Sequence, residues 1–169
     1  MTTTADVFTD AFGRVREVVH DVVGGLPADQ LLYRPGPEAN SIGWLVWHLT
    51  RVQDDHVSEV AGMEQAWTGD GWSGRFGLPY DDATVGYGQT PAEVGKFTVT
   101  SGDLLIGYHD AVHARTIEFV RTLSDPDLDR IVDERWNPPV TLSVRLVSVI
   151  DDDAQHAGQA AYVRGLLKA

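Results

Sequence analysis

Apolar residues recur at every third or fourth position near the start of the chain, the spacing that aligns side chains on one face of an α-helix. The stripe follows Thr3 and Thr4, which are suitable N-cap residues, and it stops at Gly24-Gly25. Its members are Phe8, Phe12, Val15, Val19, Val22 and Val23. We therefore predict a first long amphipathic helix between the two threonines and the glycine pair.

Three later stretches show the same spacing, and each follows a capping residue. The Asn40-Ser41 pair precedes a predicted helix over residues 42–60, and Ser101 precedes one that ends near residue 123. Thr141 precedes a last helix, which we expect to run to about Lys168. Residues 26–39 and 127–137 are predicted connectors, and the second of these is polar.

The segment over residues 62–89 is irregular, with many glycines and no helical stripe. Loops of this length are usually functional or disordered, and aromatic anchors favour order here. These anchors are Trp67, Trp72, Phe76, Tyr80 and Tyr87. Directly after the loop, Thr90-Pro91 and Glu93 have the pattern of a capping box and predict a short helix. The prediction is all-α: a single four-helix bundle over residues 1–169, with a long irregular loop between helices two and three.

Composition removes several classes of function. The chain has 25 acidic and 13 basic side chains and a formal net charge of −12, which argues against binding to nucleic acids or anionic membranes. It has no cysteine, so a thiolate metal site and a cysteine nucleophile are excluded. No signal peptide or membrane-spanning stretch is recognisable, and we expect a cytoplasmic protein.

The predicted fourth helix carries an acidic run, Asp151-Asp152-Asp153, inside an apolar stretch. Asp152 and His156 are four residues apart and therefore share one face of the helix. A carboxylate and an imidazole in an apolar strip need compensation, because burying an unpaired charge is costly. A salt bridge between the two would supply it, and so would a metal ion shared with His48. His48 lies on the predicted second helix and points toward the interior of the bundle or its edge.

The other histidines have weaker patterns. His20 and the pair His109 and His113 lie on the flanks of apolar stripes, with no third ligand evident for the pair. His56 lies in the polar run over residues 51–56, which we expect to be mostly solvated. We assign none of these four histidines to a site.

Two motifs and one loop resemble the DinB-like superfamily. Residues 40–49, Asn-Ser-Ile-Gly-Trp-Leu-Val-Trp-His-Leu, resemble its helix-two signature, and His156-Ala-Gly-Gln159 resembles its last-helix motif. Residues 86–91 resemble a loop of one bacterial branch. The resemblance implies a four-helix bundle with a divalent metal held by one histidine on helix two and by a pair four apart on the last helix. By position, these ligands are His48, Asp152 and His156.

One position departs from the commonest family pattern, because many members have histidine where Asp152 stands. The branch that resembles mycothiol-dependent maleylpyruvate isomerase and mycothiol S-transferases accepts a carboxylate there. Zinc binds both oxygen and nitrogen ligands, and nickel accepts the same set. The carboxylate should hold the ion more tightly and make it a weaker Lewis acid. We expect Asp151 and Asp153 to be solvated or to support the ligands, and Gln159 to lie beside His156.

Three protein ligands leave an open position on zinc, which is typical of catalytic sites. A thiol bound there would react as a thiolate, whereas a bound water would hydrolyse an amide or an ester. By resemblance, the leading hypothesis is a thiol S-transferase that uses mycothiol and an electrophilic substrate. The alternatives are a hydrolase and a stress-response binding protein with a non-catalytic metal site. No catalytic residue is assigned, Asp55 is the single general-base candidate, and we expect a monomer or homodimer.

Overall fold

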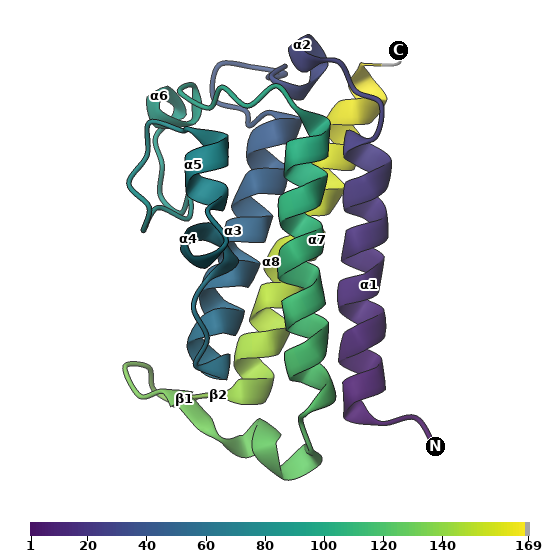
Figure 1. Cartoon of the computed structure of the whole chain (residues 1–169), viewed down its shortest axis with the longest axis vertical. Coiled ribbons are helices and arrows are strands. Elements are labelled where there is room, and N and C mark those ends of the chain that lie inside the picture. The colour runs from purple at the N-terminus through teal and green to yellow at the C-terminus, as the bar shows by residue number, and fades with distance from the viewer. Residues whose placement is uncertain (168–169) are drawn as a thin grey trace.

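The computed structural model describes residues 1–167, and four long helices run side by side through it (Figure 1). They are α1 (Thr4–Val23), α3 (Ile42–Ala61), α7 (Gly102–Arg121) and α8 (Leu142–Leu166). Helix α3 packs against α7 and α8, and α1 packs against the same two helices from the other side. The predicted all-α four-helix bundle is confirmed. Lys168, the expected end of the fourth helix, lies outside the described residues.

The predicted capping residues begin all four helices. The hydroxyls of Thr3, Ser41, Ser101 and Thr141 each accept a hydrogen bond from a backbone N–H in the first turn. These bonds satisfy donors that have no partner within the helix. Local sequence therefore fixes where each long helix begins.

The interior of the bundle contains two apolar clusters with polar side chains between them. On α3, Gln53 lies between Leu49 of one cluster and Val60 of the other, and it donates to Thr116 of α7 at 2.7 Å. On α8, Asp153 occupies the equivalent position and is fully buried. We expected Asp153 to be solvated or to support the ligands. The first alternative is wrong, because the core-facing stripe of α8 continues through Asp153. Burial raises the pKa of the Asp153 carboxyl well above its usual range.

The prediction that residues 51–56 form a solvated surface was also wrong. Arg51, Gln53 and Asp54 are fully buried. Gln53 packs against α7, and the segment after α3 folds back over Arg51 and Asp54. Asp54 accepts hydrogen bonds from the backbone N–H groups of Ala66 and Trp67 at 2.9 and 2.8 Å. The polar pattern of this helix face predicts a face exposed to solvent, but other segments of the chain cover it.

The segment between α3 and α7 is ordered, as predicted. It contains the short helices α4 (Ala66–Gly69), α5 (Trp72–Phe76) and α6 (Pro91–Val94), and α6 begins at the expected Thr90 capping box. Another short helix, α2 (Ala28–Leu31), lies in the connector after α1. Figure 1 shows α4, α5 and α6 stacked along one side of the bundle, next to α3.

The predicted polar connector before α8 has more structure than its sequence indicates. It contains a 3-10 helix, η1 (Asp125–Asp129), and two antiparallel strands, β1 (Ile131–Asp133) and β2 (Val140–Thr141). Strand β2 continues directly into α8, whose N-cap is Thr141. We call residues 131–141 the hairpin, and it lies across the end of the bundle where α3 ends and α8 begins (Figure 1). None of the helices over residues 1–167 is both long and apolar enough to span a membrane.

Candidate metal centre

His48 lies on α3 with 5% of its surface exposed, and its ring stacks on that of Trp44, with 4.8 Å between ring centroids. Its Nδ1–H donates to the carbonyl oxygen of Val85, which belongs to the loop after α5. That bond fixes the tautomer, so the Nε2 lone pair is left for a ligand. Burial lowers the pKa of His48, which keeps the imidazole neutral, the form that binds metals.

Helix α8 brings the other two predicted residues to the same place. The rings of His48 and His156 meet edge to face with their centroids 4.7 Å apart. His156 donates from Nδ1 to Oε1 of Gln159 at 2.9 Å, so its Nε2 also carries a lone pair. Gln159 therefore has the predicted position beside His156.

One potential ligand atom from each of His48, Asp152 and His156 lies within 4.8 Å of the other two. Atoms bonded to one zinc ion at about 2 Å lie roughly 3–4 Å apart, so a small side-chain adjustment brings the three onto one ion. Among residues 1–167, no other group of three such side chains converges in this way. The sequence-predicted set is thus brought together.

The state of Asp152 fits a bound cation. Its Oδ2 is buried and has no hydrogen-bond partner among the described residues. Its Oδ1 lies 3.6 Å from His156 Nε2, longer than the roughly 2.7–2.9 Å of a charge-assisted hydrogen bond. Two acceptors therefore face each other with no donor between them. A simple salt bridge explains this arrangement less well than a shared metal ion, and the donor set can hold one.

Two members of the group, His48 and Asp152, form part of the wall of a cleft with a volume of about 610 Å³. Val85 and Tyr87 of the loop form one side, and the unpredicted hairpin forms another with Trp136 and Val140. Tyr87 and Trp136 are 91% and 66% exposed, so two aromatic rings border the cleft and are open to solvent. The remaining lining residues are Val52, Asp55, His56, Asp133, Arg135, Val144, Arg145, Ser148 and Val149.

Arg51 ties the loop to α3 just before Val85. Its guanidinium donates to the backbone carbonyls of Asp82 and Thr84 at 3.2 and 3.3 Å, and to Gln65 Oε1 at 2.9 Å. The side chain is fully buried above the ring of Trp67. A buried charge without partners would be costly, and here the loop carbonyls satisfy it. The part of the loop directly before Val85, whose carbonyl orients His48, is therefore held by a second contact.

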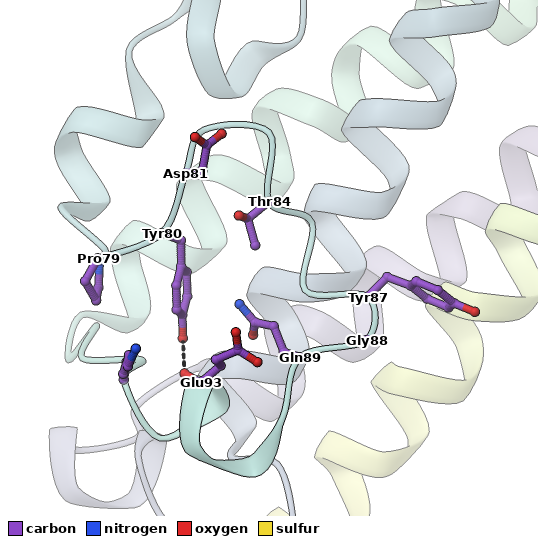
Figure 2. A pocket seen from close by; sticks show the side chains of 9 residues that line it. Pro79, Tyr80, Asp81, Thr84, Tyr87, Gly88, Gln89 and Glu93 are labelled. Atoms are coloured by element: carbon purple, nitrogen blue, oxygen red, sulfur yellow. Dashed lines mark hydrogen bonds between the residues drawn. The ribbon is translucent and has the colours of Figure 1, made fainter.

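A smaller hollow of about 340 Å³ lies along the same loop (Figure 2). The Tyr80 hydroxyl donates to the carbonyl oxygen of Glu93 at 2.9 Å, drawn as a dashed line in Figure 2. Tyr87 borders this hollow and the cleft, and Figure 2 shows its ring pointing away from the other labelled side chains. None of the three grouped residues lines it, and we assign it no ligand.

The remaining histidines lie outside the group of His48, Asp152 and His156, which we call the metal group. His109 is fully buried, not on a flank as predicted, and its Nδ1 contacts the hydroxyl of Thr50 at 3.2 Å. Burial lowers its pKa to about 3. His20 contacts Asp110 at 2.8 Å on α7. His56 differs from these, because it lines the cleft. The sequence signal for His56 is its spacing of two helical turns from His48, although the polar run around it indicates a solvated side chain.

The DinB superfamily sequence model matches residues 11–160 of the chain. The chain belongs to the DinB superfamily. A crystal structure described as the conserved protein of a locus from Enterococcus faecalis is 30% identical in sequence to this DinB-family chain. The two superpose with a TM-score of 0.91, over 97% of this chain and 96% of that one. No protein with curated function matches the chain. Membership in the DinB superfamily accounts for the fold.

Proposed function

We propose that this DinB-family protein is a divalent-metal-dependent thiol S-transferase whose metal is held by His48, Asp152 and His156. One observation carries the proposal: the three donor groups converge with their lone pairs free, and two of them, His48 and Asp152, line an open cleft. Two imidazoles and one carboxylate suit zinc, and nickel accepts the same donors. The neighbouring space is large enough for small-molecule substrates.

A divalent ion in this place would lower the pKa of a thiol that reaches it, so that the thiol would react as a thiolate. The chain has no cysteine, so the thiol comes from a low-molecular-weight substrate. Mycothiol is our choice, because the motifs around His48 and His156 resemble those of mycothiol-dependent enzymes. The chain itself orients the donor nitrogens through Val85 and Gln159, and the cleft receives the electrophile.

A pair of neighbouring carboxylates provides a matched test. Asp152→Asn should remove the metal-binding charge, whereas Asp151→Asn changes an exposed carboxylate that interacts with Gln155. We expect zinc to co-purify with the wild type and with Asp151→Asn, and to be at least 10-fold depleted in Asp152→Asn. Transfer of mycothiol to monochlorobimane should be lost in the same variant alone.

Three other results would each contradict the transferase. Wild-type protein that binds no divalent metal would exclude the metal centre. Thiol-independent turnover of esters or amides would identify a hydrolase at the same site. Metal binding without turnover of any electrophile would identify a non-catalytic metal protein.

A further inference from the structure

His56 lies on the same side of α3 as His48, two helical turns further along, and both side chains line the cleft. Eight residues of helix correspond to about 12 Å along the axis. The cleft therefore reaches from His48 and Asp152 of the metal group to His56. A molecule anchored at the metal group would lie with its body toward His56.

Arg145 of α8 determines which nitrogen of His56 carries the hydrogen. Its Nη1 lies 3.2 Å from His56 Nδ1, and a guanidinium can only donate. Nδ1 is therefore the acceptor, and the ring hydrogen is on Nε2. Arg145 is 7% exposed and also contacts Glu59 and Asp133, so its position does not depend on His56. Burial and the nearby Arg145 charge lower the pKa of His56, which agrees with a neutral ring.

The Nε2–H of His56 has no acceptor among the described residues, yet it is not a buried orphan atom. Because the side chain is 40% exposed and lines the cleft, this N–H is open to the cleft. Much of the lining around it is apolar, with Val52, Val144 and Val149 nearby in the wall. A fixed donor in such a wall is suited to selecting an acceptor on a ligand.

The charges around His56 indicate which acceptor fits. Arg145 is paired with Glu59 and Asp133, and Arg135 is paired with Asp133. Asp55 adds a further carboxylate beside His56. Three carboxylates therefore face two arginines, and neither arginine is left over for an anionic ligand. The surroundings favour an uncharged oxygen over a carboxylate.

We propose that His56 recognises the thiol substrate: its Nε2–H donates to a carbonyl or hydroxyl oxygen on a thiol whose sulfur lies at the His48–Asp152–His156 group. The proposal rests on the proposed function for the placement of the sulfur. It adds that the thiol carries an uncharged oxygen some distance from its sulfur. It also makes His56 a binding residue, so its loss raises KM for the thiol more than it lowers kcat.

The test compares three thiols of similar length on the cobalt-substituted protein. N-acetylcysteamine carries an amide carbonyl, pentanethiol has no acceptor, and mercaptobutyrate carries a carboxylate. Thiolate-to-cobalt absorption bands give each affinity. We expect N-acetylcysteamine to bind roughly threefold to tenfold more tightly than the other two thiols. This ratio of affinities corresponds to the net free energy of one hydrogen bond. His56→Leu should abolish this preference, and His56→Gln, which keeps an N–H donor, should retain part of it.

Nitrogen NMR of the zinc-loaded protein with labelled histidine provides the second measurement. We expect the His56 proton on Nε2 and a shift of its resonance when N-acetylcysteamine is added, but none with pentanethiol. A proton on Nδ1, equal affinities for the three thiols, or an unchanged preference in His56→Leu would overturn the proposal. If no thiol gives a cobalt band, the proposed function is wrong. The histidine shift then still decides whether His56 binds the carbonyl.

Discussion

Two histidines that line the cleft, His48 and His56, and the neighbouring His156 show how one residue type performs opposite tasks. The Nδ1–H groups of His48 and His156 donate to the oxygens of Val85 and Gln159, so both rings present an Nε2 lone pair. His56 accepts at Nδ1 from Arg145 and presents an Nε2–H. The neighbour of each Nδ1 thus decides whether the ring can bind a metal or donate to a ligand.

His109 leads to a prediction about stability and pH. Its folded-state pKa is about 3, below the unfolded value of 6.5, because the ring is fully buried. Its contribution to folding is therefore complete above pH 6.5 and is lost as the pH falls toward 3, since only the unfolded chain takes up the proton. Between pH 7 and 5, this group should cost the wild type about 2 kcal/mol of unfolding free energy.

Urea unfolding of the wild type and of His109→Gln at the two pH values measures this contribution. The glutamine variant should lose about 2 kcal/mol less over this range. Because the other histidines are present in both proteins, the difference belongs to position 109. Equal losses in the two proteins would show that His109 is protonated in the folded state.

Some residues of the site were predictable and others were not. The predictable residues were His48, Asp152 and His156. Helical spacing puts Asp152 and His156 on one face, and the family motifs on the second and last helices identify the full set. Arg51 and Asp153 have the sequence pattern of polar surface, although other segments cover them. Helical periodicity shows which side chains share a face, but it does not show which later segment will pack on a polar face.

At the scale of elements, the loop after α5 acts as a support for α3. The backbone of Gly86 has φ +97° and passes so close that an added Cβ would lie 2.7 Å from His48 Nδ1. Gly88 has φ +73°, and a Cβ added there would meet no other atom within 4 Å. Both glycines have a conformation that other residues rarely adopt, and only one lies against the metal group.

These two glycines make a matched pair of variants. Gly86→Ala should push the loop away from His48, break the bond to Val85 and weaken zinc binding by about 10- to 100-fold. Gly88→Ala should cost similar backbone strain but leave zinc affinity within about twofold of the wild type. Competition titration with a zinc chelator measures both. A similar loss of affinity in the two variants would mean that general loop strain, rather than close approach, is responsible.

Among the elements, the long helices were predicted from the sequence and the hairpin was not. The long helices and their caps follow from stripes and capping residues that lie next to each other in sequence. The hairpin was missed because strands of three and two residues are too short to show the alternation that identifies a strand. The hairpin also contacts residues in other parts of the chain, and the pattern of a single sequence does not show which distant segments will meet.

For the whole molecule, the metal group joins α3 to α8, the helix pair with the most extensive mutual packing. An ion that binds the folded chain but not the unfolded chain stabilises the folded state by mass action. At a free zinc concentration about 100 times Kd, this stabilisation is about 2.7 kcal/mol, and it should raise Tm by roughly 5 to 10 °C. Thermal unfolding with and without zinc measures it, and Asp152→Asn should show no increase. An equal increase in that variant would place the stabilising zinc elsewhere.

The two sides of the cleft differ in what they are attached to. The loop is bonded to His48 and Arg51, whereas the hairpin contacts Arg145 through Asp133. Arg130, directly before the hairpin, donates to the backbone carbonyl of Val60 at the far end of α3. Residues 134–139 can therefore be lengthened, shortened or exchanged without touching a donor of the metal group. Libraries confined to this turn would therefore vary the lining of the cleft while the metal group stays unchanged.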